Sequence, residues 1–552
     1  MTHPTRVING RAAHAEGVYG QKWLSLVAVI WLQSISGTNF NFPAYSSQLK
    51  KMMGISQLQL NDLAFASDTG KLLGWLSGVA ALHLPLWLVL LIGVSLGLLA
   101  YGLQYLFLVV YGHNLSYALV FFLTVLAGNS ICWINTVCYA AIIGSFAPKS
   151  RQVAVGLTTS YQGLSANIYT DIVDVVAAHT SSIAGRRAMA YLLLNAFLPA
   201  IVAATTAPFI GDSSFYHRDD DTSGEVGGEF VVLFALTIVT GVYAVISSLR
   251  SISDQISPVY FTIGIGLLLL APLVVPVTER VRWWSSRQHK IQVNDVVTSE
   301  LHYSDEDDHR IDLPEGGSGN VGDVHEISGP IPEEVGCRVM LRRLDFWLYY
   351  FVYMFGATLG MVYLNNLGQI TESRGGSSRT TSSLVSMASA FGFFGRLLPS
   401  LLDYYLFSRQ KLALSRPALV AVMMVPMAGS FFLLLSSSDL CLCISTAFIG
   451  ICTGSITSIS VSMTADLFGT KNFSVNHNVV VANIPVGSFI FGYLAAVLYR
   501  REGDGSGKCI GMECYRKSFI IWGGLCFIGT NLAMLLHARS RHLYSGRGST
   551  GK

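Results

Sequence analysis

Charged side chains are scarce in this sequence. Asp, Glu, Lys and Arg make up 12% of the 552 residues, whereas an average soluble protein has about 25%. Basic and acidic residues nearly balance, with 36 Lys and Arg against 33 Asp and Glu, so neither a nucleic-acid-binding surface nor an acidic tail dominates the chain. The nine cysteines show no C-x-x-C or Cys/His metal spacing. We expect no metal, no other cofactor and no nucleic-acid partner.

A polar catalytic cluster is also missing. Three short matches to catalytic or nucleotide-binding patterns begin at Gly93, Gly317 and Gly546. They lie inside an apolar run, in a charged loop and at the end of the chain, without the neighbouring strand and helix that these patterns need. We therefore expect that the protein is not an enzyme.

Long apolar runs are what the sequence has instead. Leu84–Val110 and Val259–Val277 each continue for about 18 residues or more without a charge, which is the length that a helix needs to cross about 30 Å of hydrocarbon. Such runs predict an all-α membrane protein with about 14 spans in two bundles. We place the spans near 23–44, 58–82, 85–110, 116–147, 153–178, 188–209, 229–249 and 258–278, and then near 346–364, 383–404, 417–436, 440–466, 475–498 and 518–537.

A polar segment at 279–343 separates the two bundles. It holds an acidic run at 305–308 and a Gly-rich stretch at 316–322, a composition that cannot bury enough apolar surface to fold alone. Lys and Arg in short loops favour the cytoplasmic side, and most of them here predict that this linker and both termini are cytoplasmic. The same topology puts Arg186, Arg187 and a basic cluster at 500–517 on the non-cytoplasmic side, which goes against this preference. The choice between the plasma membrane and an endomembrane, such as the vacuole or ER, stays open.

This topology puts Cys509 and Cys514 on the outer or lumenal face, where thiols can oxidise. Their separation of five residues permits a small loop disulfide, and two unpaired thiols are the alternative. The topology also puts Asn114-Leu115-Ser116 outside, as a glycosylation acceptor in a very short loop.

Ionisable residues inside the spans are rare, because each costs about 2.5–3.5 kcal/mol on insertion scales. Asp68 and Lys71 are three residues apart on one helical face, and Asp68 lies roughly 15 Å below the outer boundary. A substrate or proton site and a neutralised pair that stabilises helix packing both fit. Gly70, Gly74 and Gly78 continue this face at four-residue spacing, which favours close approach of another backbone.

Polar residues also interrupt other spans. The segment 39–43, with Asn39 and Asn41 among aromatic residues, predicts either a helix discontinuity that lines a cavity or an interfacial anchor. A polar stripe in the fourth span, with Asn129, Trp133 and Asn135, should face the interior, where it contacts either substrate or neighbouring helices.

The tenth span carries Gly395 and Arg396, followed by Asp403 at its end and by Arg409 in the next loop. A carboxylate at a helix end beside a basic loop predicts a group that braces a gate. The alternative is ordinary positive-inside charge next to an edge carboxylate.

Ordered motifs along the chain give a family resemblance. They include Ser67-Asp68-x-Gly70-Lys71-x-x-Gly74-Trp75-x-x-Gly78, Gly128-Asn129-Ser130-x-x-Trp133-x-Asn135-Thr136, Tyr161-x-Gly163-Leu164-Ser165, Asn365-Asn366-Leu367-Gly368-Gln369, Phe394-Gly395-Arg396 and Asp466-Leu467-Phe468-Gly469. In these motifs the chain resembles the plant nodulin-like, nuclear fusion defective 4-like family of the major facilitator superfamily. The sequence departs from the superfamily pattern at Leu82-His83-Leu84-Pro85, which replaces an acidic and basic loop, and at Thr158-Thr159-Ser160, where the family has a Lys.

The resemblance implies a two-bundle fold of 12 core transmembrane helices plus about two more, with a central cavity and alternating access. It divides the chain into a cytoplasmic N-terminus at 1–22, a six-helix nodulin-like bundle at 23–209, two additional helices at 210–278, the cytoplasmic linker at 279–343, a second six-helix bundle at 344–537 and a cytoplasmic tail at 538–552.

The leading functional hypothesis is a secondary transporter of a small polar or organic solute, with Asp68 as the candidate proton site. Its partners would be the solute and the lipid bilayer, and a monomer is the default. The alternative is a non-transporting sensor or membrane-fusion factor that uses the same scaffold. Neither the resemblance nor the residues name a substrate.

Overall fold

The structure, a computed structural model, describes residues 5–111, 116–178, 186–210, 228–248, 257–282, 334–408, 415–503 and 509–541, with single positions at 284, 285, 288 and 543. Every regular element in these ranges is a helix and none is a strand, which confirms the expected all-α class. Eleven of the described helical stretches are long and apolar enough to cross a membrane. Asn114, Arg409 and linker residues 289–333 lie outside the described residues.

The first half of the protein comprises the helices from α1 to α9. Their bounds are α1 Thr5–Ser36, η1 Thr38–Asn41, α2 Phe42–Met53, α3 Gln57–Thr69, η2 Gly70–Leu73, α4 Gly74–His83, α5 Leu86–Tyr111, α6 Tyr117–Ser145, α7 Arg151–Gln162, α8 Ser165–Ala178, α9 Arg186–Thr206 and η4 Ala207–Phe209. The predicted spans 23–44 and 58–82 are each divided into three helical segments and the span 153–178 into two, and none of the three spans is among the eleven continuous stretches.

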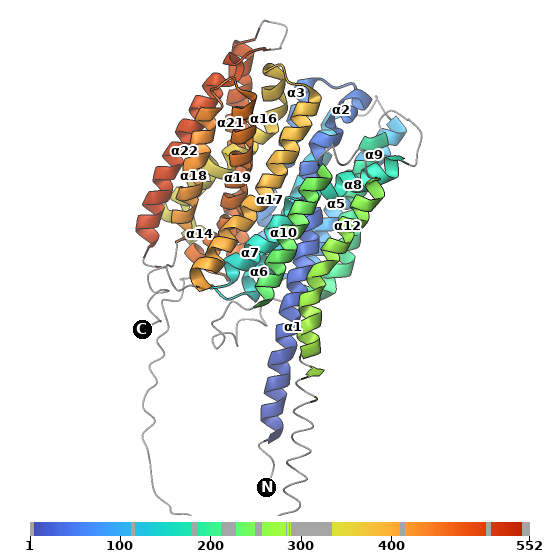
Figure 1. Cartoon of the computed structure of the whole chain (residues 1–552), viewed down its shortest axis with the longest axis vertical. Coiled ribbons are helices and arrows are strands. Elements are labelled where there is room, and N and C mark those ends of the chain that lie inside the picture. Colours follow the sequence, from blue (N-terminus) through green and yellow to red (C-terminus); the bar gives the residue numbers. More distant parts are fainter. Residues whose placement is uncertain are drawn as a thin grey trace, which may run out of the picture.

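The second half follows the linker. Its bounds are α14 Cys337–Met340, α15 Leu344–Tyr353, the π turn η7 Met354–Thr358, α16 Leu359–Ser373, α17 Ser378–Ser408, α18 Arg416–Leu433, α19 Asp439–Phe468, α20 Phe473–Val481, α21 Asn483–Arg501 and α22 Glu513–Ser540. Figure 1 shows that α1 begins and α22 ends at the same end of the molecule, which we call the terminus end. The six predicted spans of this half correspond to these helices.

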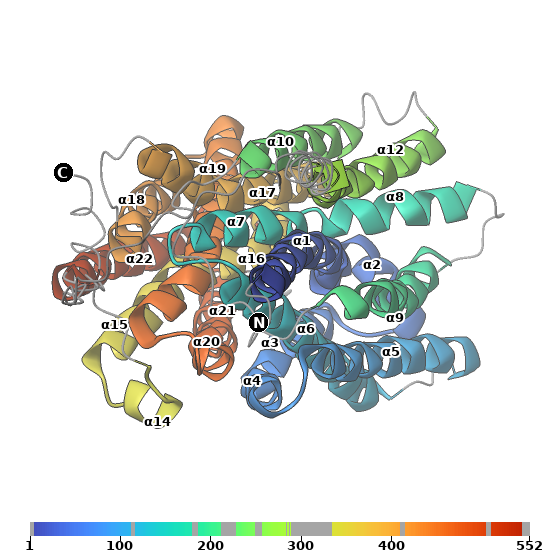
Figure 2. The same ribbon diagram turned by 90° about the horizontal axis from the view of Figure 1, so that it is seen from below.

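Between the halves in sequence, the described residues hold two more membrane-length helical stretches. One is α10 Gly228–Ser248, and the other begins with α12 Pro258–Leu270 and continues through η6 Ala271–Leu273 to Arg282. Viewed from the terminus end, α10 runs beside α17 of the second half and α12 beside α8 of the first (Figure 2). A Cβ on Gly241 of α10 would overlap the ring of Phe393 in α17. The two additions therefore cover one side of the junction between the halves.

The exterior and interior have the polarity expected in lipid. Large apolar side chains such as Leu99, Ile201 and Phe527 are more than half exposed on the outside. Polar side chains such as Gln33 and Asn195 are instead almost completely buried. An exterior of this kind has no favourable contact with water but is fully compatible with hydrocarbon.

Local sequence explains where the helices break. Gly37 precedes η1 with φ −79° and ψ 42°, outside the helical region, and Pro43 then stands at the start of α2, where its missing N–H costs nothing. The next span begins with a capping box, in which Ser56 and Gln59 satisfy each other's backbone amides. Gly70 opens η2 and Gly74 opens α4. Short 3₁₀ segments thus replace continuous helix at two points deep in the first half.

Candidate functional site

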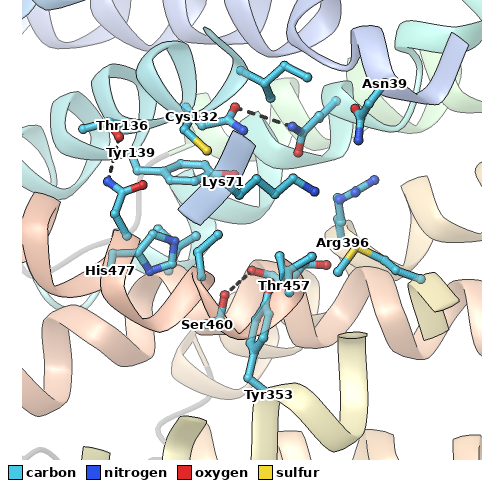
Figure 3. Close-up of a pocket in the computed structure, with 18 of the residues that line it drawn as sticks. Asn39, Lys71, Cys132, Thr136, Tyr139, Tyr353, Arg396, Thr457, Ser460 and His477 are labelled. Carbon is cyan, nitrogen blue, oxygen red and sulfur yellow. Dashed lines mark hydrogen bonds between the residues drawn. The ribbon is translucent and has the colours of Figure 1, made fainter. Parts of the chain in front are cut away.

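A cavity of about 90 Å³ lies between the two halves. Both halves line it, the first with Asn39, Phe40, Lys71, Ile131, Cys132, Asn135, Thr136, Tyr139 and Gln162, and the second with Tyr353, Met361, Arg396, Thr457, Ser460, Val461, His477, Asn478, Val481 and Ile484. Figure 3 shows Lys71 and Arg396 pointing into this space from opposite halves. It is the central cavity that the sequence resemblance implies.

The cavity coincides with the breaks in the helices. Asn39 and Phe40 belong to η1, Lys71 belongs to η2, and Gln162 is the last residue of α7. In the second half, Tyr353 immediately precedes the π turn η7, and Val481 and Ile484 flank the break between α20 and α21. Interrupted helices at membrane depth occur where the freed backbone groups line a cavity. The breaks in both halves therefore converge on one site.

Lys71 and Asp68 form a buried ion pair at the edge of the cavity. Lys71 Nζ lies 2.6 Å from Asp68 Oδ1, and both residues are less than 10% exposed. Asp68 Oδ2 also accepts a hydrogen bond from Ser488 Oγ of α21, at 3.2 Å. The carboxylate does not itself line the cavity, but it joins a cavity residue of the first half to a helix of the second.

Arg396 has a different environment. It projects from α17 into the cavity, and its guanidinium carbon lies 5.9 Å from the centre of the Phe40 ring, a cation–π distance. Among the residues that the structure describes, no carboxylate forms an ion pair with Arg396 and no acceptor receives a hydrogen bond from it. The cavity therefore holds a cation without an acidic partner.

Glycines fix the position of Arg396. A Cβ on Gly395 would overlap the backbone carbonyl of Ile451 in α19, and one on Gly454 would overlap that of Gly392. On the other side of α17, a Cβ on Gly163 would lie 3.0 Å from Arg396 Nη1. Because backbone atoms meet directly, α17 is held tightly against both α19 and the break after α7.

Uncharged polar groups complete the lining. Asn135 Oδ1 accepts hydrogen bonds from Gln33 Nε2 at 3.3 Å and from Gln162 Nε2 at 3.5 Å. Asn478 Nδ2 donates to Thr136 Oγ1 at 2.8 Å, across the junction between the halves. Asn39, by contrast, lines the cavity without any hydrogen bond from its side chain to the described residues. Amides and hydroxyls of this kind are able to orient a polar solute.

Other predicted candidates lie away from the cavity. Asn129 donates to the carbonyl of Gly70 at 3.1 Å and accepts from the indole of Trp133 at 3.0 Å, so both residues support the break at η2 rather than line the cavity. Asn41 donates to Asn195 Oδ1 of α9 at 3.0 Å. Asn129 thus bonds to the neighbouring segment η2, the second of the two roles considered for the polar stripe, and Trp133 bonds to Asn129 within α6.

The glycine series on the second span packs against two different helices. A Cβ on Gly70 would overlap the carbonyl of Val125 in α6. Gly74 and Gly78 instead face α20 of the second half, where added Cβ atoms would come within 2.9 Å of Asn478 Oδ1 and 2.6 Å of the Ser474 carbonyl. One helical face therefore packs first within its own half and then, nearer the terminus end, against the other half.

Asp403 takes part in a charge cluster at the terminus end. Arg416 binds it with two nitrogens, at 2.8 and 3.2 Å, and Arg416 Nε lies 3.6 Å from Asp466 Oδ2. The expected basic neighbour, Arg409, lies outside the described residues. The sequence did not single out Arg416, because a basic residue at a helix start has no distinguishing spacing.

Several lining residues were not predicted. Tyr139, Tyr353 and His477 sit on spans that were identified correctly, but an aromatic residue in an apolar run gives no sign of which face it occupies. The polar triplet at 476–478 was a usable signal, since Asn476, His477 and Asn478 in a membrane span are costly to expose to lipid. Within the described residues, no group of His, Cys, Asp and Glu is arranged to hold a metal ion.

Cys509 and Cys514 form a disulfide with a Cα–Cα distance of 5.8 Å at the start of α22. It joins a residue just before α22 to the first turn of that helix, and this start of α22 lies at the end of the molecule opposite the terminus end (Figure 1).

Comparison with known proteins identifies the family. Residues 22–277 match the nodulin-like family, and residues 328–546 match the family described as NFD4, C-terminal domain. The chain is 36% identical to Protein NUCLEAR FUSION DEFECTIVE 4 of Arabidopsis thaliana over 550 residues, which cover 95% of this chain and 90% of that protein.

Solved structures agree on the fold. The chain is similar to the proton:xylose symporter XylE bound to 6-bromo-6-deoxy-D-glucose, with a TM-score of 0.55, 8% identity and 95% of both chains covered. It is also similar to a double Trp mutant of XylE, with a TM-score of 0.56, 11% identity, and coverage of 94% of this chain and 95% of that one. The resemblance seen in the sequence is confirmed, and the chain belongs to the nodulin-like, nuclear fusion defective 4 family, with the multi-pass membrane fold of the major facilitator transporters.

Proposed function

We propose that this protein is a secondary-active transporter that moves a small polar or organic solute by alternating access. The observation that supports this most directly is the polar cavity, which both halves line at the level where their helices break. Discontinuous helices supply the binding groups in many transporters. The structural neighbour XylE, named as a proton:xylose symporter, has the same overall fold.

The contacts between the halves support the alternating movement. At the terminus end, Gly78 packs on the backbone of Ser474, and Ser400 Oγ donates to the carbonyl of Gln152 at 2.7 Å. At the opposite end, the rings of Phe65 and Phe489 lie 5.7 Å apart. A cavity of about 90 Å³ is smaller than the roughly 300–1,000 Å³ of typical small-molecule sites. A solute therefore enters after one of these contact regions separates.

Asp68 is the group through which we propose coupling to protons. It holds Lys71 in the first half and Ser488 in the second. Protonation would remove the charge that attracts Lys71 and weaken the acceptor that Ser488 uses. The contact with Ser488 crosses between the halves and favours the closed arrangement, so protonation would shift the population toward an arrangement in which α3 and α21 separate.

The same proposal assigns roles to the parts of the chain. The bundles at 23–209 and 344–537 are the moving bodies, and 279–343 is the tether between them, with both termini in the cytoplasm. Arg416 between Asp403 and Asp466 would brace the terminus end of the second body, because all three lie at helix ends there.

Flux through reconstituted vesicles tests this function. The purified chain is placed in proteoliposomes, and uptake of a panel of radiolabelled neutral and anionic solutes is measured with and without an inward proton gradient. We expect gradient-dependent accumulation of at least one solute by the wild type. Asp68→Asn should abolish the dependence on the gradient, whereas Asp439→Asn, which changes an exposed carboxylate at the start of α19, should not.

Two results would contradict the proposal. If folded wild-type protein moves no solute of any class, the chain is not a transporter, and the sensor or membrane-fusion alternative replaces it. If Asp68→Asn accumulates solute as the wild type does, transport stands but Asp68 is not the coupling group.

A further inference from the structure

The charge of the cavity carries information about its ligand. Lys71 and Arg396 are the charged members of the described lining, and neither Asp nor Glu is among them. Asp68 balances Lys71 at 2.6 Å. Adding these three formal charges, two positive and one negative, leaves the cavity with one uncompensated positive charge at Arg396.

An uncompensated charge at membrane depth is expensive. Insertion scales place Arg among the costliest residues at a span centre, and a charge that lacks a partner is more destabilising than an ion pair. Phe40 offers a π face at 5.9 Å, which compensates only part of a full charge. A second charged species of opposite sign would complete the site.

Neighbouring groups suit a bound anion. Lining side chains able to donate hydrogen bonds include Asn39, Gln162, Tyr353 and Thr457. The Asn39 side chain donates no hydrogen bond to the described residues, so its amide donor is available to a ligand. Figure 3 shows Arg396, Asn39 and the ammonium end of Lys71 on the same side of the cavity. The planar guanidinium fork matches the two oxygens of a carboxylate or phosphate.

We propose that the cavity selects a small organic anion, whose carboxylate or phosphate group binds Arg396. This inference rests on the proposed transport function for its physiological meaning, but binding itself can be measured separately. The anion supplies the missing negative charge at the junction between the halves. Because Arg396 belongs to the second half and Lys71, Phe40 and Asn39 to the first, a bound anion also favours closure of the halves around it.

Binding to the full chain in lipid nanodiscs tests the proposal. Calorimetric titrations compare matched pairs of probes, succinate with succinamide and glycerol 3-phosphate with glycerol, and D-glucose serves as a further neutral probe. We expect binding by at least one anion and none by its neutral counterpart. The carboxylate and phosphate arms show which group the site accepts.

Variants of Arg396 separate recognition from folding. Arg396→Gln should weaken anion binding by at least about tenfold, the scale of one lost charged hydrogen bond. Arg396→Lys should retain part of the affinity, because it keeps the charge and loses the fork. Arg516→Gln, at an exposed position of α22 in the same half, is the matched control and should bind as the wild type does.

Thermal unfolding without ligand adds an independent readout. Arg396 is partly buried and has no ion-pair partner among the described residues, so its removal in Arg396→Gln should leave the unfolding temperature unchanged or raised, whereas replacing an Arg with a purely structural role would lower it. A lowered temperature together with unchanged anion binding would overturn the proposal.

The remaining outcomes distinguish the two proposals. Binding and flux of neutral solutes, with no binding of anions, would overturn the anion site and leave transport standing. Anion binding that depends on Arg396, without flux in proteoliposomes, would support the site and overturn transport. Absence of any binding and any flux by folded wild-type protein would overturn both.

Discussion

Ser400 in the second half donates a hydrogen bond to the backbone carbonyl of Gln152 in the first, with 2.7 Å between the oxygen atoms. The side chain of Gln152 is fully buried. Its amide nitrogen donates to Ser458 Oγ at 3.4 Å, and its amide oxygen accepts from Ser462. One residue of α7 is therefore bound to both α17 and α19, and opening of the terminus end must break these contacts together.

Gln152→Ala should favour an open terminus end. Loss of two side-chain hydrogen bonds at about 1 kcal/mol each would shift the closed-to-open ratio by roughly tenfold or more. The measurement is a distance distribution by electron–electron resonance, between genetically encoded spin labels at His83 and Lys471, which are exposed residues of opposite halves. We expect a longer-distance population that is weak or absent in the unsubstituted chain.

A matched variant controls for a general loss of packing. Ser445→Ala changes a buried hydroxyl of α19 that has no hydrogen-bond partner in the described part of the chain, so it should leave the distance distribution unchanged. If Gln152→Ala and Ser445→Ala give the same distribution, the contacts of Gln152 do not hold the terminus end closed.

The pair Asp68 and Lys71 should behave as a unit in stability measurements. Asp68→Asn leaves Lys71 buried without its carboxylate, and breaking a buried pair from one side costs about 3–5 kcal/mol. Asp68→Asn combined with Lys71→Gln removes both charges and should recover most of that loss. Thermal unfolding in detergent checks this, and the unfolding temperature should fall in the order wild type, double variant and Asp68→Asn single variant. Simple additivity of the two single effects would show that the pair is not coupled in the folded protein.

The overall fold was accessible from the sequence because hydrocarbon imposes a simple rule on it. A helix must cover about 30 Å with apolar residues, and runs such as Leu84–Val110 satisfy that requirement with no information about neighbours. Even the broken spans were found, since a helix interrupted at Gly37 or Gly70 still has apolar residues on both sides. The apolar residues of each span are thus enough to show which segment crosses the membrane.

The sequence is less informative about which side chains line the cavity. That depends on how each helix is rotated about its own axis and on how it packs against the opposite half. Lys71, Asn39, Asn135 and Arg396 were selected for their polarity and do line the cavity. Trp133 met the same criterion and instead bonds to Asn129. A polar residue inside a span is expected to face the interior of the protein. Its polarity does not show whether it contacts another helix or lines a cavity, because both environments suit a polar side chain.

The close contact between Gly128 and Ser67 gives a stability prediction within the first half. A Cβ on Gly128 would overlap the backbone carbonyl of Ser67, and neither backbone can move without separating α6 from α3. Gly128→Ala should lower stability by about 1–3 kcal/mol or more. No atom of the described residues lies within 4 Å of a Cβ added at Gly102 in α5, so Gly102→Ala should be neutral or stabilising through its better helix propensity. Unfolding temperatures of the two variants check this, and equal effects would contradict the packing.

The disulfide between Cys509 and Cys514 provides a test of orientation. The disulfide lies at the end of the molecule opposite the terminus end. We propose that this disulfide-bearing end faces the outer or lumenal side, where disulfides persist. In sealed vesicles of known sidedness, a membrane-impermeant reductant followed by an impermeant alkylating reagent should label both cysteines when that face is accessible. Free Cys526, which is fully buried within the helices, should stay unlabelled in the same sample until the protein is denatured. Labelling of Cys509 and Cys514 from the cytoplasmic side alone would reverse the proposed topology, and with it the assignment of both termini to the cytoplasm.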